Sequence, residues 1–196
     1  MENDLSAKVD SVDATDAILS AGMVQMEAAH AEGHYTVECR DAEGNLKWND
    51  EIENLVVNVG KNLALDTLFA GSAYTTVGPF MGLANTAVAS ATATDTMAAK
   101  TVWTEVGTTN APAYTAPRKT VTFSAAATGS KASTGTYTFA FTSGGTVGGC
   151  FIVTGTGAVS TIDSTAGVLY SVGAFTGGSK VVATSDTLTV TYSASM

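Results

Sequence analysis

The second half of the chain is a succession of short β-prone segments separated by glycine-rich turns. Thr favours strands and Gly favours turns, so each run is predicted to be a strand that ends at the next turn. Strands at intervals of roughly 10–16 residues are typical of a β-sandwich or jelly roll. The expected strands are 79–83, 119–124, 136–142, 149–154, 168–172, 180–183 and 187–192, with turns at 144–145, 155–157 and 177–178 and a long loop over 84–101.

Residues 34–72 contain further elements of the same kind. Alternating apolar and polar residues over 34–39 and 46–48, around a turn at 41–45, predict a β-hairpin. Residues 55–59 are expected to form another strand. The apolar spacing over 62–69, followed by Gly71, predicts one short internal helix.

The N-terminal 33 residues are predicted to be an acidic arm. Ser11 or Asp13 can cap a helix over 11–30, and Gly33 is its stop signal. The apolar stripe of this helix is narrow, so we expect it to dock on its own domain or on a neighbouring subunit. The side chains of this apolar stripe are the candidate partner-binding residues: Ile18, Leu19, Met23 and Met26.

These elements predict a mainly β fold: an antiparallel β-sandwich or jelly-roll-like body with an N-terminal helical arm and one short internal helix. The expected division is an arm over 1–33 and a body over 34–196. Within the body, 34–72 holds the hairpin, a strand and the short helix, and 73–196 forms the sandwich.

The charge is low and unevenly placed. Charged residues make up 14% of the chain, and Ala, Thr, Ser and Gly together make up half of it, which argues against a helical bundle. The net charge of −9 argues against a nucleic-acid binder.

The N-terminus is acidic where a signal peptide would be basic, and no apolar run is long enough to cross a membrane. Cys39 and Cys150 are expected to be free thiols, with a disulfide as the alternative.

No motif for catalysis, a cofactor or a metal is recognised. His30 and His34 are four residues apart, but the Glu of a His-Glu-x-x-His site is missing. No Gly-x-Ser-x-Gly sequence occurs, and the glycines at 155 and 157 lack the third of a dinucleotide fingerprint. The remaining candidates are the acidic residues of the β half, Asp95, Glu105, Asp163 and Asp186, which a glycoside hydrolase would need in pairs. We expect no enzyme, and we expect Asp95 and Glu105 to cap or pair locally with Arg118, and Trp103 and Tyr114 to be core aromatics.

Several segments between residues 35 and 193 carry a family resemblance through their order. They are 54–62 with Leu65, Leu68 and Phe69; 80–83; 95–97 leading to 103–105, Tyr114 and Arg118; 148–153; 167–170; and 186–192. In this order they resemble a family of small structural proteins of tailed bacteriophages, usually encoded close to the major capsid protein. The resemblance implies a virion component without enzymatic activity.

Together these features predict a capsid cement or decoration protein. It would bind the outer surface of the shell at capsomer junctions as a homo-oligomer, with the major capsid protein as its partner and the acidic segment 1–53 as its clamp. Such a protein is made in the host bacterial cytoplasm and resides on the virion. The alternatives are a tail- or fibre-associated protein or a host-receptor-binding β module, and then a glycan-degrading enzyme.

Overall fold

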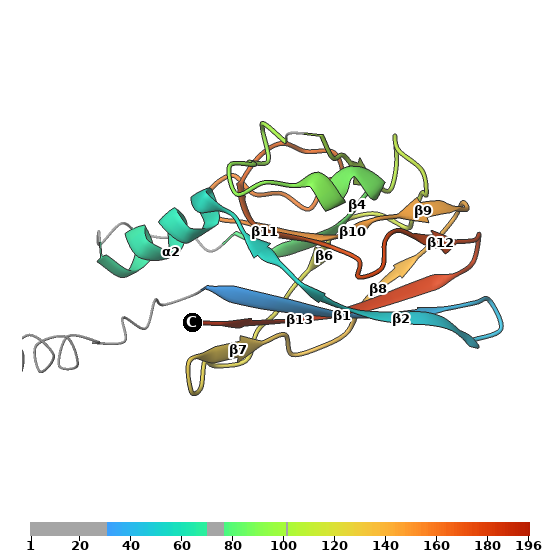
Figure 1. The fold of residues 1–196 in the computed structure, drawn as a ribbon, viewed down its shortest axis with the longest axis horizontal. Helices are drawn as coiled ribbons and strands as arrows, with labels where there is room; N and C mark the ends of the chain where they lie inside the picture. Colours follow the sequence, from blue (N-terminus) through green and yellow to red (C-terminus); the bar gives the residue numbers. More distant parts are fainter. Residues whose placement is uncertain (1–30, 70–76, 101) are drawn as a thin grey trace, which may run out of the picture.

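The computed structural model describes residues 31–69, 77–100 and 102–196, and their dominant feature is two facing antiparallel β-sheets. Figure 1 shows the sheets as two layers, with helix α2 (Asn58–Phe69) beside the upper layer at one end of the molecule. The sandwich body expected from the short strands is therefore confirmed. The expected helix over 11–30, with Ile18, Leu19, Met23 and Met26, lies outside the described residues.

The first sheet is built around the two ends of the described chain. Strand β1 (Glu32–Arg40) pairs along its whole length with the last strand, β13 (Thr187–Ser195). The other edge of β1 pairs with β2 (Leu46–Glu53), and the two strands form the predicted hairpin. On the far side, β13 pairs with β7 (Ser130–Ala132) and β8 (Tyr137–Ala140). The predicted hairpin thus belongs to the sandwich itself, and β1 begins at Glu32, within the range assigned to the arm.

The second sheet has the order β3-β11-β10-β4-β5, with β6 also paired to β4. A separate two-stranded ribbon joins β9 to β12. The bounds are β3 (Leu55–Val56), β4 (Phe80–Ala84), β5 (Glu105–Val106), β6 (Lys119–Thr120), β9 (Gly145–Val147), β10 (Gly149–Thr154), β11 (Val168–Ala174) and β12 (Lys180–Val182).

Strand β10 is buried along its whole length because it faces two cores. Cys150 and Ile152 point into the core between the sheets. Phe151 and Val153 point the other way, into a second core covered by the 3₁₀ helix η1 (Thr86–Ser90) and the loop that carries Trp103. The second sheet is therefore covered on both faces, as the continuous apolar sequence of β10 requires.

The expected strand over 55–59 is wrong beyond residue 56, where the chain turns into α2. Val57 is buried in the second core, and its N–H donates to the Tyr170 carbonyl. The Lys61 N–H then donates back to the Val57 carbonyl and opens the helix. The β-branched residues favour a strand locally, but docking on β11 decides the outcome, since tertiary contacts override local propensity.

Other differences concern short elements. The expected strand 119–124 is a strand only at Lys119–Thr120, and the expected loop 84–101 contains η1. Gly145, expected in a turn, begins β9, and the strands β5 and β7 had no clear pattern. Each of these strands is two or three residues long, which is too short for alternation to be detected.

Candidate functional site

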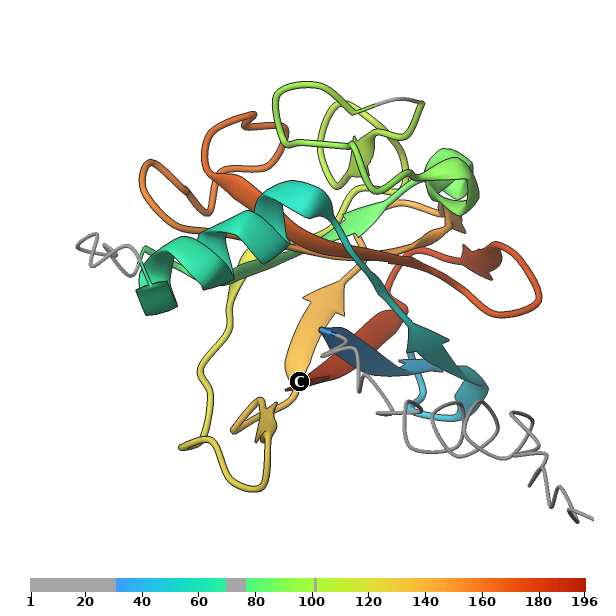
Figure 2. The ribbon, with the colours of Figure 1, turned by 60° about the vertical axis from the view of Figure 1, so that its left-hand side comes forward.

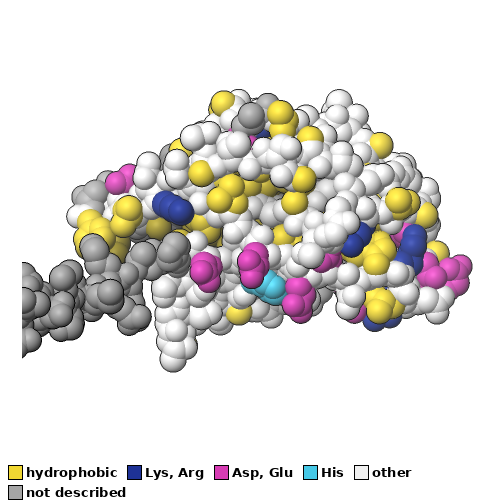
Figure 3. All heavy atoms as spheres, viewed as in Figure 1, with side chains coloured by type: hydrophobic (Ala, Val, Ile, Leu, Met, Phe, Trp, Pro, Cys, Tyr) yellow, Lys and Arg dark blue, Asp and Glu magenta, His cyan; other side chains and the backbone are white. Residues whose placement is uncertain are grey.

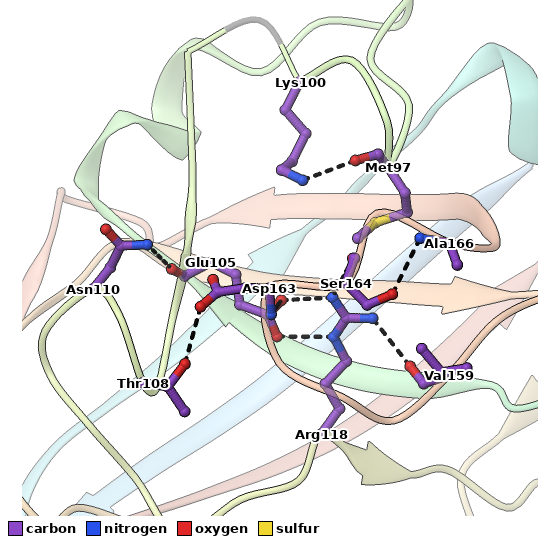
Figure 4. Close-up of polar contacts among 10 residues, drawn as sticks. All are labelled: Met97, Lys100, Glu105, Thr108, Asn110, Arg118, Val159, Asp163, Ser164 and Ala166. Atoms are coloured by element: carbon purple, nitrogen blue, oxygen red, sulfur yellow. Dashed lines mark hydrogen bonds and ion pairs between the residues drawn. The ribbon is translucent and has the colours of Figure 1, made fainter.

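The most concentrated buried charge is an ion pair between Glu105 and Arg118, shown in Figure 4. Arg118 Nε donates to Glu105 Oε1 at 2.8 Å, and Arg118 Nη2 donates to Oε2 at 2.6 Å. The guanidinium also donates to the carbonyls of Val159 and Ser164. The second carboxylate oxygen accepts the Asp163 N–H at 2.8 Å. The expected partnership of Glu105 with Arg118 is confirmed.

Through these hydrogen bonds, the Glu105–Arg118 pair holds the loop that contains Val159, Asp163 and Ser164 in place. Both carboxylate oxygens of Glu105 are engaged, and Arg118 is 1% exposed. Burial raises the pKa of the Glu105 carboxyl, while the adjacent Arg118 guanidinium opposes that shift. A general acid needs a substrate within hydrogen-bond reach, and neither residue lines a hollow described below.

The other two buried carboxylates of the β half are also held by neighbours. Asp95 accepts the Trp103 indole N–H at 2.8 Å and the Thr92 hydroxyl at 2.9 Å, and both donors are its neighbours in sequence. Asp186 accepts the Ala183 N–H and pairs with Lys47 of β2. The fourth acidic residue, Asp163, is joined to Glu105 through its backbone N–H, and its carboxylate accepts the Thr108 hydroxyl at 2.9 Å.

The remaining chemical groups offer no assembled site. His34 lies in strand β1, 3.9 Å from a Glu51 carboxylate oxygen, and His30 lies outside the described residues. Within the described ranges, no cluster of three His, Cys, Asp or Glu side chains could hold a metal ion. In the same residues, no helix is long and apolar enough to span a membrane.

Cys39 and Cys150 are unpaired, as expected, and the structure shows that both are buried. Burial raises the pKa of Cys39 to about 11 and raises the pKa of Cys150 well above its usual range. Because the thiolate is the reactive form, these side chains behave as packed apolar groups at neutral pH.

One hollow of the described surface is an apolar groove between α2 and the end of the sandwich. We call it the α2 groove, and its volume is about 620 Å³. Leu63, Ala64 and Thr67 form its helical wall. The opposite wall combines both sheets with the link from β6 to β7, which crosses from one layer to the other (Figure 2). The other lining residues are Gly60, Gly78, Pro79, Val121, Thr122, Phe123, Lys131, Ile152, Thr154, Tyr170, Tyr192 and Ala194.

Helix α2 carries a second apolar face that contacts little. Leu65, Leu68 and Phe69 follow one another at i, i+3 and i+4, the spacing of one helix face. Phe69 is 78% exposed and Leu68 is 70% exposed. Figure 3 shows hydrophobic side chains gathered at this end of the molecule. A helix that is apolar on two sides is normally covered on both.

A smaller, more polar hollow of about 430 Å³ adjoins the α2 groove, and the two share Ala194. Ala31, Glu32 and Gly33 line it, so the N-terminal segment is attached to the body at this hollow.

The sequence predicted the short internal helix α2 but not the side of it that faces the α2 groove. The available signal was the presence of apolar residues on two faces of a short helix, at 63, 65, 68 and 69.

Comparison of the chain with known protein families, with curated proteins and with solved structures found no match. The candidate site is therefore interpreted from its own geometry. An open apolar groove with an uncovered helix face beside it can bind another polypeptide, and the buried ionic groups keep the surrounding loops in place.

Proposed function

We propose that this chain is a non-enzymatic structural protein of a bacteriophage virion, and within it a capsid cement or decoration protein. The observation that carries the proposal is the α2 groove with the exposed Leu65, Leu68 and Phe69 beside it. Apolar surface of this kind typically marks a protein–protein contact. The assignment to a virion rests on the resemblance of the sequence to structural proteins of tailed bacteriophages.

In this proposal the partner is the major capsid protein, and the protein binds as a homo-oligomer outside the shell at capsomer junctions. The acidic arm, with Ile18, Leu19, Met23 and Met26, would meet the shell surface. A protein that binds only the assembled shell stabilises it by mass action, and every copy repeats the gain. Synthesis in the host bacterial cytoplasm would precede addition to the particle.

The engagement of the buried carboxylates supports a structural role over catalysis. Glu105, Asp95 and Asp186 each hold a loop through a hydrogen bond or ion pair. A glycosidase needs two carboxyl groups facing one substrate space at a defined separation. Glu105, Asp95, Asp186 and Asp163 do not line either of the two hollows described above.

The test is the copy number of the chain in purified virions, measured by quantitative mass spectrometry against the major capsid protein. A cement protein is expected at a simple ratio to the capsid protein, with one copy or oligomer for each repeated junction. A small number of copies per particle would contradict the cement role and favour the tail, fibre or receptor alternative. Absence from the particle would refute the virion assignment.

A further inference from the structure

We propose that the α2 groove is the docking site for the apolar stripe of the same chain's N-terminal segment, the side chains Leu19, Met23 and Met26 with Ile18 beside them. The free protein would then hold its arm against its own body. This inference requires no virion, so it stands or falls separately from the cement role.

The shape of the groove suits a helix. One wall is the helix α2 itself, through Leu63, Ala64 and Thr67, and the opposite wall presents Phe123 and Tyr192. Recognition of a helix in a groove uses anchors at i, i+4 and i+7. Leu19, Met23 and Met26 have that spacing. The two methionines suit an irregular apolar wall, because their side chains are unbranched and adaptable.

The point of attachment brings this segment within reach of the groove. Ala31 lines the smaller hollow, and Ala194 lines both hollows. Met26 is five positions before Ala31, a separation that an extended chain can span with about 17 Å. A short tether gives its ligand an effective concentration in the millimolar range. The segment of the same chain therefore has an advantage over a second copy.

The charge of the α2 groove is opposite in sign to that of the segment. Residues 1–30 contain six acidic residues and one lysine. Lys131 is the charged side chain among the described residues that line the α2 groove, whereas the smaller hollow is lined by Lys61 together with Glu32 and Glu53. Rim charges of opposite sign favour encounter and orientation, while the buried apolar side chains provide most of the affinity.

Site-specific photo-crosslinking of the full-length chain tests the proposal. Thr67 lines the groove and is exposed, so a cysteine-directed benzophenone on Thr67→Cys would face any occupant. Because Cys39 and Cys150 are buried, the label is directed to the introduced thiol. Thr184→Cys, exposed in the turn between β12 and β13, is the matched control. An equal mixture of light and heavy isotope-labelled protein separates crosslinks within a chain from crosslinks between chains.

The expected result is a crosslink from Thr67→Cys to a peptide within residues 11–30 of the same chain, and none from Thr184→Cys. Met23→Glu in the same protein should lower the yield by about tenfold or more, because burial of one such side chain is worth more than a factor of ten. Val24→Glu, on the opposite side of the expected helix, should leave the yield unchanged. Circular dichroism of each variant checks that the body remains folded.

Four outcomes would overturn the proposal. The first is a crosslink to residues 70–76 instead of 11–30, which would make that connection the occupant. The second is a crosslink that joins light and heavy chains, which would assign the groove to a second copy. The third is a yield that Met23→Glu does not change. The fourth is the absence of any crosslink to 11–30.

Discussion

At the scale of single residues, the Glu105–Arg118 pair joins β5 to the segment before β6 and to the loop after β10. Arg118 contacts Glu105 at one side and the carbonyls of Val159 and Ser164 at the other. Its guanidinium also lies over the Phe151 ring, with 5.4 Å between the guanidinium carbon and the ring centroid. One buried cation thus holds the loop after β10 against β5.

We predict that Arg118→Met lowers the free energy of unfolding by about 3–5 kcal/mol, because it leaves the Glu105 carboxylate buried without its partner. Urea unfolding followed by circular dichroism measures the loss. The double variant with Glu105→Gln should lose less than the sum of the two single variants, since it buries no isolated charge. Additive losses would contradict a direct energetic coupling.

The buried thiols predict a loss of stability in alkali. The pKa of Cys39 is raised to about 11 and that of Cys150 is raised further, so the folded protein retains protons that the unfolded chain releases from about pH 9 upward. This contribution to stability is complete below the unfolded pKa and is lost as the pH rises through the folded pKa.

The expected outcome is a fall of about 1.4 kcal/mol per pH unit for each retained proton. Urea unfolding at a series of pH values between neutral and alkaline measures it. Cys150→Ala should reduce the slope, even if it also lowers the stability at neutral pH. An unchanged slope in that variant would show that the Cys150 proton contributes nothing.

At the scale of elements, helix α2 depends on a glycine where it meets the second sheet. A Cβ on Gly60 would lie 2.9 Å from the Tyr170 Cα and closer still to its carbonyl oxygen. These are backbone atoms of β11, which cannot rotate away as a side chain could. The absence of a side chain at Gly60 therefore sets how closely α2 approaches β11 and forms one end of the α2 groove.

We predict that Gly60→Ala destabilises the protein by up to about 2 kcal/mol. Overpacking against the backbone costs about 1–3 kcal/mol, and the gain in helix propensity offsets about 1 kcal/mol of this cost. Thermal unfolding measures the net effect. Asn62→Ala, at an exposed position of the same helix, is the control and should be neutral or slightly stabilising. A Gly60→Ala protein as stable as the parent would show that α2 can shift without penalty.

At the scale of the whole molecule, the described residues that follow the arm contain two cores. The core between the sheets begins at Tyr35, and the second core begins at Val57. The predicted boundary between arm and body after residue 33 lies too late in the chain. Gly33 already pairs with Ala194 in the sheet, and its carbonyl accepts the Asn54 N–H. A cut that spares the body therefore lies at residue 30 or earlier.

We predict that a chain lacking residues 1–30 still folds cooperatively but no longer decorates phage shells. Sedimentation with purified shells measures the binding. Removal of residues 1–40 is the control: it deletes β1 from between β2 and β13, and the product should not fold. Normal decoration by the chain without 1–30 would show that the arm is not the clamp.

Local patterns determined much of the fold. Gly-rich turns and short apolar runs located β10, β11, β12 and β13, and alternation located the β1–β2 hairpin. The free state of the two cysteines was predicted from their number and spacing. The pairing of Glu105 with Arg118 was also predicted, and a low-charge chain has few partners for each buried charge. These features depend on neighbours in sequence or on the scarcity of alternatives.

Tertiary structure alone decided the rest. The change from strand to helix after Val56, the pairing of β1 with β13 and the α2 groove all require contacts between residues far apart in the chain. Gly60 illustrates the reason: its place in a helix depends on the backbone of Tyr170, 110 positions later. Local propensities differ by about 1 kcal/mol or less, so burial against a distant strand outweighs them.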